Sequence, residues 1–121
     1  MAQQRKNILL ADDDDGILDV LTIMLESDGY NVHTTLRGEE VLEIKGEMPD
    51  LILLDISMAG IDGRDICRFL KNQDFTSHIP IIMISANRDT EAIAREAGAD
   101  DFIIKPFDMD FLLQKVAQHS N

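Results

Sequence analysis

The sequence predicts an α/β fold in which helices cover both faces of a five-stranded parallel sheet. Four short apolar runs end in polar or charged residues, and such runs are typical of strands buried on both faces of a sheet. Stretches with the spacing of helices separate these runs from one another and from a fifth, weaker run. Strict alternation of strands and helices favours right-handed crossovers and an open sheet between two helical layers.

The five strands are predicted in order along the chain. The four continuous runs end sharply, and the second strand, which alternates and is rich in β-branched residues, resembles an edge strand. Pro49 stands just before the third strand, and Pro80 stands before the last four residues of the apolar run that predicts the fourth. The predicted strands are residues 8–11, 30–35, 51–54, 79–84 and 102–104.

Five helices follow from apolar residues that recur every three or four positions. Gly29 and Gly98 stand where the first and fourth helices would end, and Asp108 is placed to begin the last one. The apolar residues that define the helices are Ile17, Leu21, Met24 and Leu25; Val41, Leu42 and Ile44; Ile66, Phe69 and Leu70; Ile93 and Ala97; and Phe111, Leu112 and Val116.

Length and charge limit the functional classes. The 121 residues, 45% of them apolar, suit one domain over residues 1–121 with a core over about residues 6–119. The 23 acidic and 11 basic residues give a formal net charge of -12, and the basic residues are scattered, so we expect no direct binding to nucleic acid or to a membrane. The single cysteine, Cys67, and the absence of a secretory signal pattern favour the cytoplasm.

Polar side chains stand directly after the predicted strands. They are Asp12, Asp13 and Asp14 after the first strand, Asp55 at the end of the third, Ser85 at the end of the fourth and Lys105 at the end of the fifth. Binding sites of open parallel sheets lie beyond the carboxyl ends of the strands, so we expect these groups to meet. Clustered carboxylates repel one another unless a cation relieves the repulsion, and Mg²⁺ prefers hard oxygen ligands. Asp12, Asp13 and Asp55 therefore predict a site for Mg²⁺, or for Mn²⁺ in its place.

The same residues suit phosphoryl transfer. Asp55 is the best nucleophile because it ends a central buried strand, where its carboxylate is fixed and directed at the metal. Mg²⁺ and Lys105 would supply positive charge to the phosphoryl oxygens. Asp14 and Asp15 are better explained as acidic residues at the start of a helix.

Four segments, taken in order, resemble the receiver domains of response regulators in two-component signal transduction. They are residues 8–17 (ILLADDDDGI), 50–63 (DLILLDISMAGIDG), 80–86 (PIIMISA) and 98–107 (GADDFIIKPF). The resemblance covers nearly the whole chain and implies a flavodoxin-like, doubly wound fold with strand order 2-1-3-4-5. It also implies a phosphoacceptor of a two-component system or phosphorelay, without independent turnover of a separate substrate.

The resemblance assigns roles to the residues around the phosphoacceptor. It implies that Asp55 accepts a phosphoryl group from the phosphohistidine of a histidine kinase or a histidine phosphotransfer protein. Asp12 and Asp13 would hold Mg²⁺, and the backbone carbonyl of Ser57 would complete the protein ligands. By the same analogy, Ser57 and Asn87 flank the route to the acyl phosphate and tune its lifetime.

A switch follows from the same resemblance. Ser85 would move to bond the phosphoryl group, Lys105 would pair with it, and Phe102 would change rotamer to fill the vacated space. The bond between Lys105 and Pro106 is expected to be cis. In the family, a surface of the fourth helix, fifth strand and fifth helix reads out the state and often serves for homodimers. Two departures are Phe102, where tyrosine is frequent, and Ala59, where proline is common.

Three other functions fit the sequence less well than the switch. A receiver that only docks partners is disfavoured by the complete set of site residues. A Mg²⁺-dependent aspartate phosphohydrolase would want a second carboxylate where Ser57 stands, and a flavin or nucleotide module would want a phosphate-binding loop where the four aspartates stand. His33, His78 and His119 lack a second ligand at metal spacing, so we expect surface or loop histidines.

Overall fold

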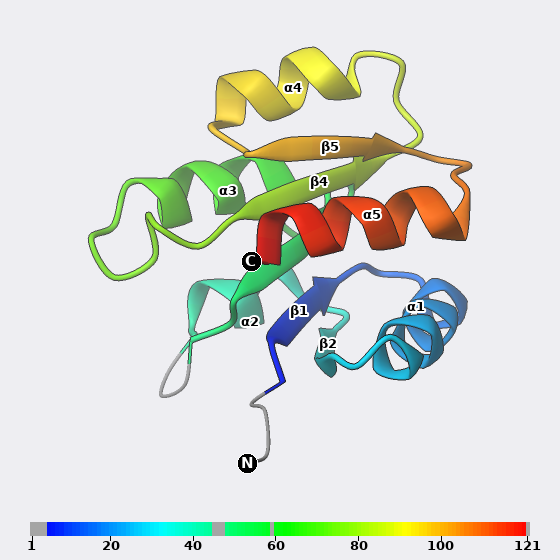
Figure 1. The fold of residues 1–121 in the computed structure, drawn as a ribbon. Helices are drawn as coiled ribbons and strands as arrows, with labels where there is room; N and C mark the ends of the chain where they lie inside the picture. Colours follow the sequence, from blue (N-terminus) through cyan, green and yellow to red (C-terminus); the bar gives the residue numbers. More distant parts are fainter. Residues whose placement is uncertain (1–4, 45–47, 59, 121) are drawn as a thin grey trace.

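The computed structural model describes residues 5–44, 48–58 and 60–120, which form a five-stranded parallel sheet with five helices (Figure 1). The strands lie in the order β2-β1-β3-β4-β5, as predicted. The strands are β1 (Asn7–Ala11), β2 (Asn31–Thr35), β3 (Leu51–Asp55), β4 (Ile81–Ser85) and β5 (Asp101–Ile104). The helices are α1 (Asp15–Ser27), α2 (Gly38–Leu42), α3 (Gly63–Lys71), α4 (Thr90–Ala97) and α5 (Met109–Ser120).

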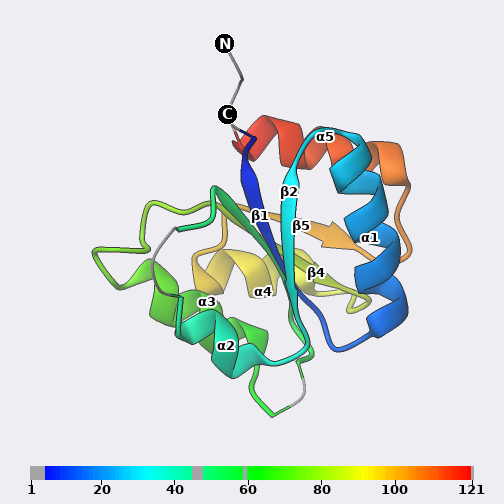
Figure 2. The ribbon, with the colours of Figure 1, turned by 90° about the horizontal axis from the view of Figure 1, so that it is seen from below.

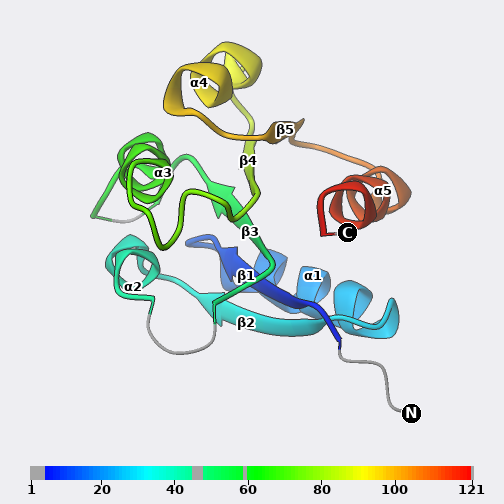
Figure 3. The same cartoon turned by 60° about the vertical axis from the view of Figure 1, so that its left-hand side comes forward.

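The helices form two layers, one on each face of the sheet. Figures 2 and 3 show α1 and α5 on one face and α2, α3 and α4 on the other. The order of the strands reverses between β1 and β3, since β1 continues to β2 on one side and the later strands build out on the other. The predicted three-layer arrangement is confirmed, and the reversal lies where such folds bind their ligands.

The central strand β3 explains why the apolar runs are continuous. Leu51 and Leu53 pack with the residues of α1 and α5, whereas Ile52 and Leu54 pack with those of α2, α3 and α4. Because successive side chains of a strand point to opposite faces, both faces of β3 lie in a core and all five of its residues are buried.

The fourth strand begins two residues later than predicted. Ile79 is buried, as its apolar character suggests, but β4 starts only at Ile81. Pro80 has no N–H to donate to a neighbouring strand, although its carbonyl accepts a hydrogen bond from the Ile52 N–H at 3.0 Å. The carbonyl of Ile79 is instead bound by the Lys71 ammonium at 2.8 Å, so this segment belongs to the loop.

Two aromatic residues predicted to face the core are exposed. Phe69 on α3 is 46% exposed and Phe111 on α5 is 45% exposed, because the buried stripe of each helix lies one position further along. On α3 this stripe includes Cys67, which is fully buried. Apolar periodicity alone did not distinguish the two adjacent faces of these short helices.

The ends of two helices show the expected chemistry. Asp14 is the N-cap of α1, and its carboxylate accepts hydrogen bonds from the N–H groups of Gly16 and Ile17. Gly98 ends α4 with φ at 86°, a left-handed conformation that favours glycine. Within the described part of the chain, no helix has the length and apolar character needed to cross a membrane.

Candidate phosphoacceptor and metal site

Three carboxylates meet at the carboxyl ends of β1 and β3. Asp12 and Asp13 follow β1 and Asp55 ends β3, and their nearest carboxylate oxygens all lie within 4.8 Å of one another. Asp12 and Asp55 are 4% and 6% exposed, whereas Asp13 faces solvent. This geometry suits a divalent cation that keeps several water molecules, because the site offers oxygen ligands on one side and solvent on the other.

Backbone groups and a lysine fix the two buried carboxylates. The Asp14 N–H donates to Asp12 Oδ1 at 3.0 Å, and the Ser57 N–H donates to Asp55 Oδ1 at 3.1 Å. The Lys105 ammonium lies between the other two oxygens, 3.2 Å from Asp12 Oδ2 and 3.4 Å from Asp55 Oδ2. One cation is therefore shared by two carboxylates, which leaves negative charge at the site for a metal to neutralise.

The electrostatics of the site are unfavourable without a metal. Burial raises the pKa of Asp55 to about 6, and the Asp12 carboxylate acts in the same direction, against the Ser57 N–H and the Lys105 ammonium. Burial acts to lower the pKa of Lys105, but the charges of Asp55 and Asp12 more than offset it and raise that pKa. Lys105 therefore stays charged, and the Asp55 carboxyl ionises at a higher pH than an ordinary aspartate does.

Ser85 and Lys105 extend the site across the next two strands. Ser85 ends β4 and is buried, and its Oγ accepts a hydrogen bond from the Asn87 N–H at 3.0 Å. The Lys105 N–H donates to the Ser85 carbonyl at 2.8 Å, and the Lys105–Pro106 peptide bond is cis. The side chains of Ser57 and Asn87 are exposed at the rim of the site.

Phe102 lies on β5, away from the carboxylates, where it pairs with Met83 of β4. Its half-buried ring packs against the core on the side of α2, α3 and α4, and the Lys115 ammonium lies 6.0 Å from the ring centroid. Ala59, in the loop after Asp55, lies outside the described residues.

Gly63, which no sequence motif marked as a site residue, holds the backbone around Asp55 in place. Its N–H donates to the Ile56 carbonyl at 2.8 Å, and α3 begins directly against the Asp55 and Ile56 backbone. A Cβ atom on Gly63 would collide with the carbonyl of Asp55 and would lie 2.8 Å from Ile56 Cα. A glycine directly after Asp62, the N-cap of α3, was the sequence signal for this contact.

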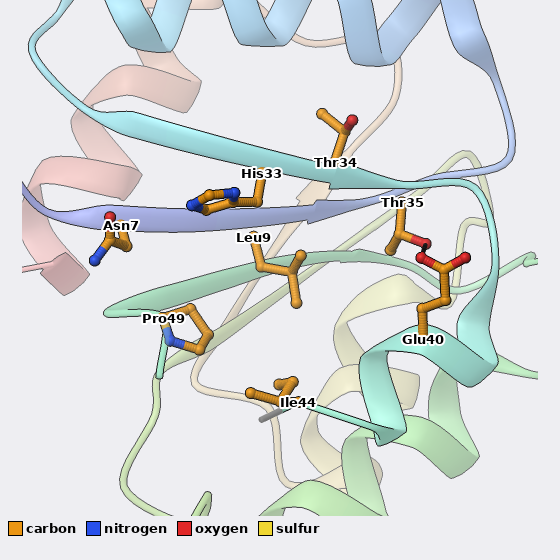
Figure 4. Close-up of a pocket in the computed structure, with 8 residues that line it drawn as sticks. All are labelled: Asn7, Leu9, His33, Thr34, Thr35, Glu40, Ile44 and Pro49. Carbon is orange, nitrogen blue, oxygen red and sulfur yellow. Dashed lines mark hydrogen bonds between the residues drawn. The ribbon is translucent and has the colours of Figure 1, made fainter. Parts of the chain in front are cut away.

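A hollow elsewhere in the molecule lacks this chemistry. A cavity of about 360 Å³ lies between β2, β1 and α2, at the β2 edge of the sheet, and Figure 4 shows the residues that line it. Among the described residues that line it, Glu40 is the one carboxylate, and its Oε2 already accepts a hydrogen bond from Thr35 Oγ1 at 2.9 Å. The candidate functional site is therefore the carboxylate cluster at the ends of β1 and β3.

Known proteins are similar to this chain in both sequence and fold. Residues 8–117 match the response regulator receiver domain. The chain is 37% identical over 119 residues to the DNA-binding response regulator MtrA of Mycolicibacterium smegmatis, which covers 96% of this chain and 51% of that protein. It is 34% identical over 112 residues to the phosphate regulon transcriptional regulatory protein PhoB of Rhizobium meliloti, covering 90% of this chain and 49% of that protein. The chain thus spans about half the length of the curated relatives it matches.

Two solved structures come from histidine kinases. The receiver domain of a signal transduction histidine kinase from Syntrophus aciditrophicus superposes with a TM-score of 0.88 at 32% identity, covering 95% of this chain and 89% of that one. The receiver domain of sensor histidine kinase PA1611 from Pseudomonas aeruginosa, solved with a magnesium ion in its active-site cleft, superposes with a TM-score of 0.87 at 28% identity, covering 97% and 98%. The chain belongs to the response regulator receiver domains, the phosphate-accepting modules of two-component signalling.

Proposed function

We propose that residues 1–121 act as one receiver domain in which Asp55 accepts a phosphoryl group in a Mg²⁺-dependent reaction. The donor is the phosphohistidine of a histidine kinase or of a histidine phosphotransfer protein. The observation that carries the proposal is the cluster of Asp12, Asp13 and Asp55 with Lys105 between two of its members. The domain dephosphorylates itself but turns over no separate substrate.

The side chains present fit a Mg²⁺ site. Asp12, Asp13 and Asp55 would hold the ion together with the Ser57 carbonyl, and Mn²⁺ has the same preference for oxygen ligands. When bound, Mg²⁺ supplies positive charge that offsets the repulsion among the carboxylates and the phosphoryl oxygens.

The remaining chemistry belongs to the protein. A carboxylate oxygen of Asp55 attacks phosphorus as the phosphorus–nitrogen bond of the donor breaks, and the electron pair of that bond returns to the imidazole, which takes up a proton. Lys105 pairs with the transferred group, and the Ser85 hydroxyl donates a hydrogen bond to it. Ser57 and Asn87, exposed at the rim, control how water reaches the acyl phosphate.

The readout surface is formed by α4, β5 and α5. Movement of Ser85 toward the phosphoryl group frees space that Phe102 fills, which changes the population of shapes of this surface. Exposed Ile104 and Phe111 lie on β5 and α5 and suit contact with a downstream protein or a second copy. The net charge of -12 argues against direct contact with nucleic acid by this domain, and its single cysteine suits the reducing cytoplasm.

Intact-mass spectrometry after incubation with acetyl phosphate tests the proposal. The wild type should gain one phosphoryl group in Mg²⁺ and none in a chelator, and Asp55→Asn should gain none in either. Asp15→Asn is a matched control, because Asp15 is an exposed aspartate in the first turn of α1 and should leave the reaction unchanged. An adduct that persists in Asp55→Asn would contradict the assignment of the acceptor, and no adduct despite Mg²⁺ binding would favour a docking module.

A further inference from the structure

A charged cluster at the start of β5 joins this strand to α5. The Lys115 ammonium donates to both carboxylate oxygens of Asp101, at 2.9 Å each. The His119 Nε2 lies 2.8 Å from Asp101 Oδ2, so the surface histidine expected at position 119 is instead half-buried and bonded. Burial acts to raise the pKa of Asp101, but hydrogen bonds from Lys115 and His119 outweigh it and lower that pKa. The ammonium of Lys115 is thus held by an ionised carboxylate.

The same ammonium lies near two aromatic rings. Its distances are 6.0 Å to the centroid of Phe102 and 5.3 Å to that of Phe111. Phe111, Lys115 and His119 recur every four residues on α5 and therefore form one stripe along the helix. Lys115 is largely buried, with a side chain 23% exposed, so its attraction to the rings is less screened than that of a surface lysine.

Phe102 is free to move on one side. Its inner side packs against the core, while its outer side borders an open hollow of about 410 Å³ that Phe111 and Lys115 also line. The ring is therefore not enclosed by close packing, and weak forces decide which position it prefers.

We propose that Lys115 is a positioning residue that holds Phe102 in the place seen here and opposes its turn toward the space beside Ser85. The inference rests on the proposed function, in which Phe102 turns after phosphorylation. Asp101 fixes the ammonium, so Lys115 cannot follow the ring, and the attraction is lost when the ring moves. Lys115 thereby sets the threshold of the switch.

The size of the effect follows from the strength of such contacts. A partly buried cation near an aromatic ring contributes a free energy that corresponds to about a twofold to fivefold change in population. Replacing Lys115 with methionine keeps the length of the side chain and removes its charge. His119 should still bond Asp101 in this variant, so the Asp101 carboxylate keeps a hydrogen-bond partner.

Fluorine NMR of protein labelled with 4-fluorophenylalanine measures the position of Phe102. The signal is assigned with Phe102→Leu, and the switched position is defined in the wild type with beryllium fluoride and Mg²⁺. We expect the Phe102 signal of unmodified Lys115→Met to lie displaced toward the switched position, with a twofold to fivefold larger switched population and a similarly faster reaction with acetyl phosphate. Lys115→Gln should behave like Lys115→Met, and Lys115→Arg should restore the wild-type signal and rate.

Lys71→Met is the matched control. Lys71 is also a largely buried lysine paired with an aspartate, Asp100, at 2.6 Å, but it lies on α3. Its loss should lower thermal stability and leave the Phe102 signal in place. An undisplaced signal in Lys115→Met, or a displaced signal with an unchanged reaction rate, would overturn the role of Lys115 while leaving the proposed function intact. If beryllium fluoride does not change the wild-type Phe102 signal, the switch itself is overturned, and the inference with it.

Discussion

Asp55 is held in a position that destabilises the folded protein when no cation is bound. Its pKa is raised from 3.8 to about 6, chiefly by burial. Between these two values the folded state binds more protons than the unfolded state, so this carboxylate makes stability fall as pH rises through that interval. Above both values, the loss of folding stability caused by the ionised Asp55 carboxylate has reached its full size and no longer changes with pH. The residue proposed to accept the phosphoryl group is thus one that folding alone would not select.

Replacing Asp55 with asparagine should therefore stabilise the protein in a chelator at pH 7.5. We expect the free energy of unfolding to increase by about 1 to 2 kcal/mol, because asparagine cannot ionise. The gain is smaller than the full cost of ionising the buried carboxyl, since the polar amide of asparagine also loses water on burial. Urea unfolding of both proteins between pH 4 and 8 measures the difference, which should shrink toward pH 4. Excess Mg²⁺ should reverse the order, since it stabilises the wild type in proportion to its binding.

Lys105 should separate metal binding from phosphorylation. The variant Lys105→Met removes a cation that competes for Asp12 and Asp55, so we expect Mg²⁺ to bind more tightly by calorimetry. The same variant should react with acetyl phosphate roughly tenfold or more slowly, because the transferred group loses a positive partner. Weaker Mg²⁺ binding in this variant would show that the lysine supports the metal site rather than competing with it.

At the scale of elements, the start of α3 is the most sensitive point near the site. The variant Gly63→Ala would place a Cβ against the Asp55 and Ile56 backbone, so we expect a loss of about 2 kcal/mol or more and weaker Mg²⁺ binding. Gly29→Ala is the control, because Gly29 has φ at 97° with no atom near the added Cβ. It should cost roughly 1 to 2 kcal/mol through backbone strain and leave Mg²⁺ affinity unchanged.

The elements were predictable in type and order but less so in their faces and ends. The continuous burial of β3 and β4 produces apolar runs that no surface helix would show, so these strands were clear from the sequence. Phe69 and Phe111 were assigned to the wrong face because they adjoin the buried stripes of short helices. The start of β4 was placed too early because Ile79 is buried in a loop, and burial alone does not make a strand.

At the scale of the whole molecule, parallel topology made the site predictable. All five strands run in one direction, so residues that end β1, β3, β4 and β5 gather at one edge whatever the details of packing. The contacts of Lys115 depend instead on how α5 lies against β5, which nothing in the local sequence determines. Phe102 lies on β5 and Lys115 on α5, and no sequence motif relates the two residues.

The net charge of -12 also makes the response to Mg²⁺ a property of the whole chain. Sodium chloride screens general repulsion, whereas Mg²⁺ additionally binds the carboxylate cluster. We therefore expect a higher melting temperature in millimolar Mg²⁺ than in sodium chloride of equal ionic strength. In Asp12→Asn the two melting temperatures should approach each other; an equal gap in this variant would place the main Mg²⁺ site elsewhere.

The hydrogen bond from the Lys105 N–H to the Ser85 carbonyl links the two residues that are expected to respond to the phosphoryl group. It lies just beyond the paired part of β4 and β5, so its rupture would not require the sheet to open. The rate at which the Lys105 N–H exchanges with deuterium should therefore report whether the site is phosphorylated. This measurement needs neither a substituted side chain nor an attached probe.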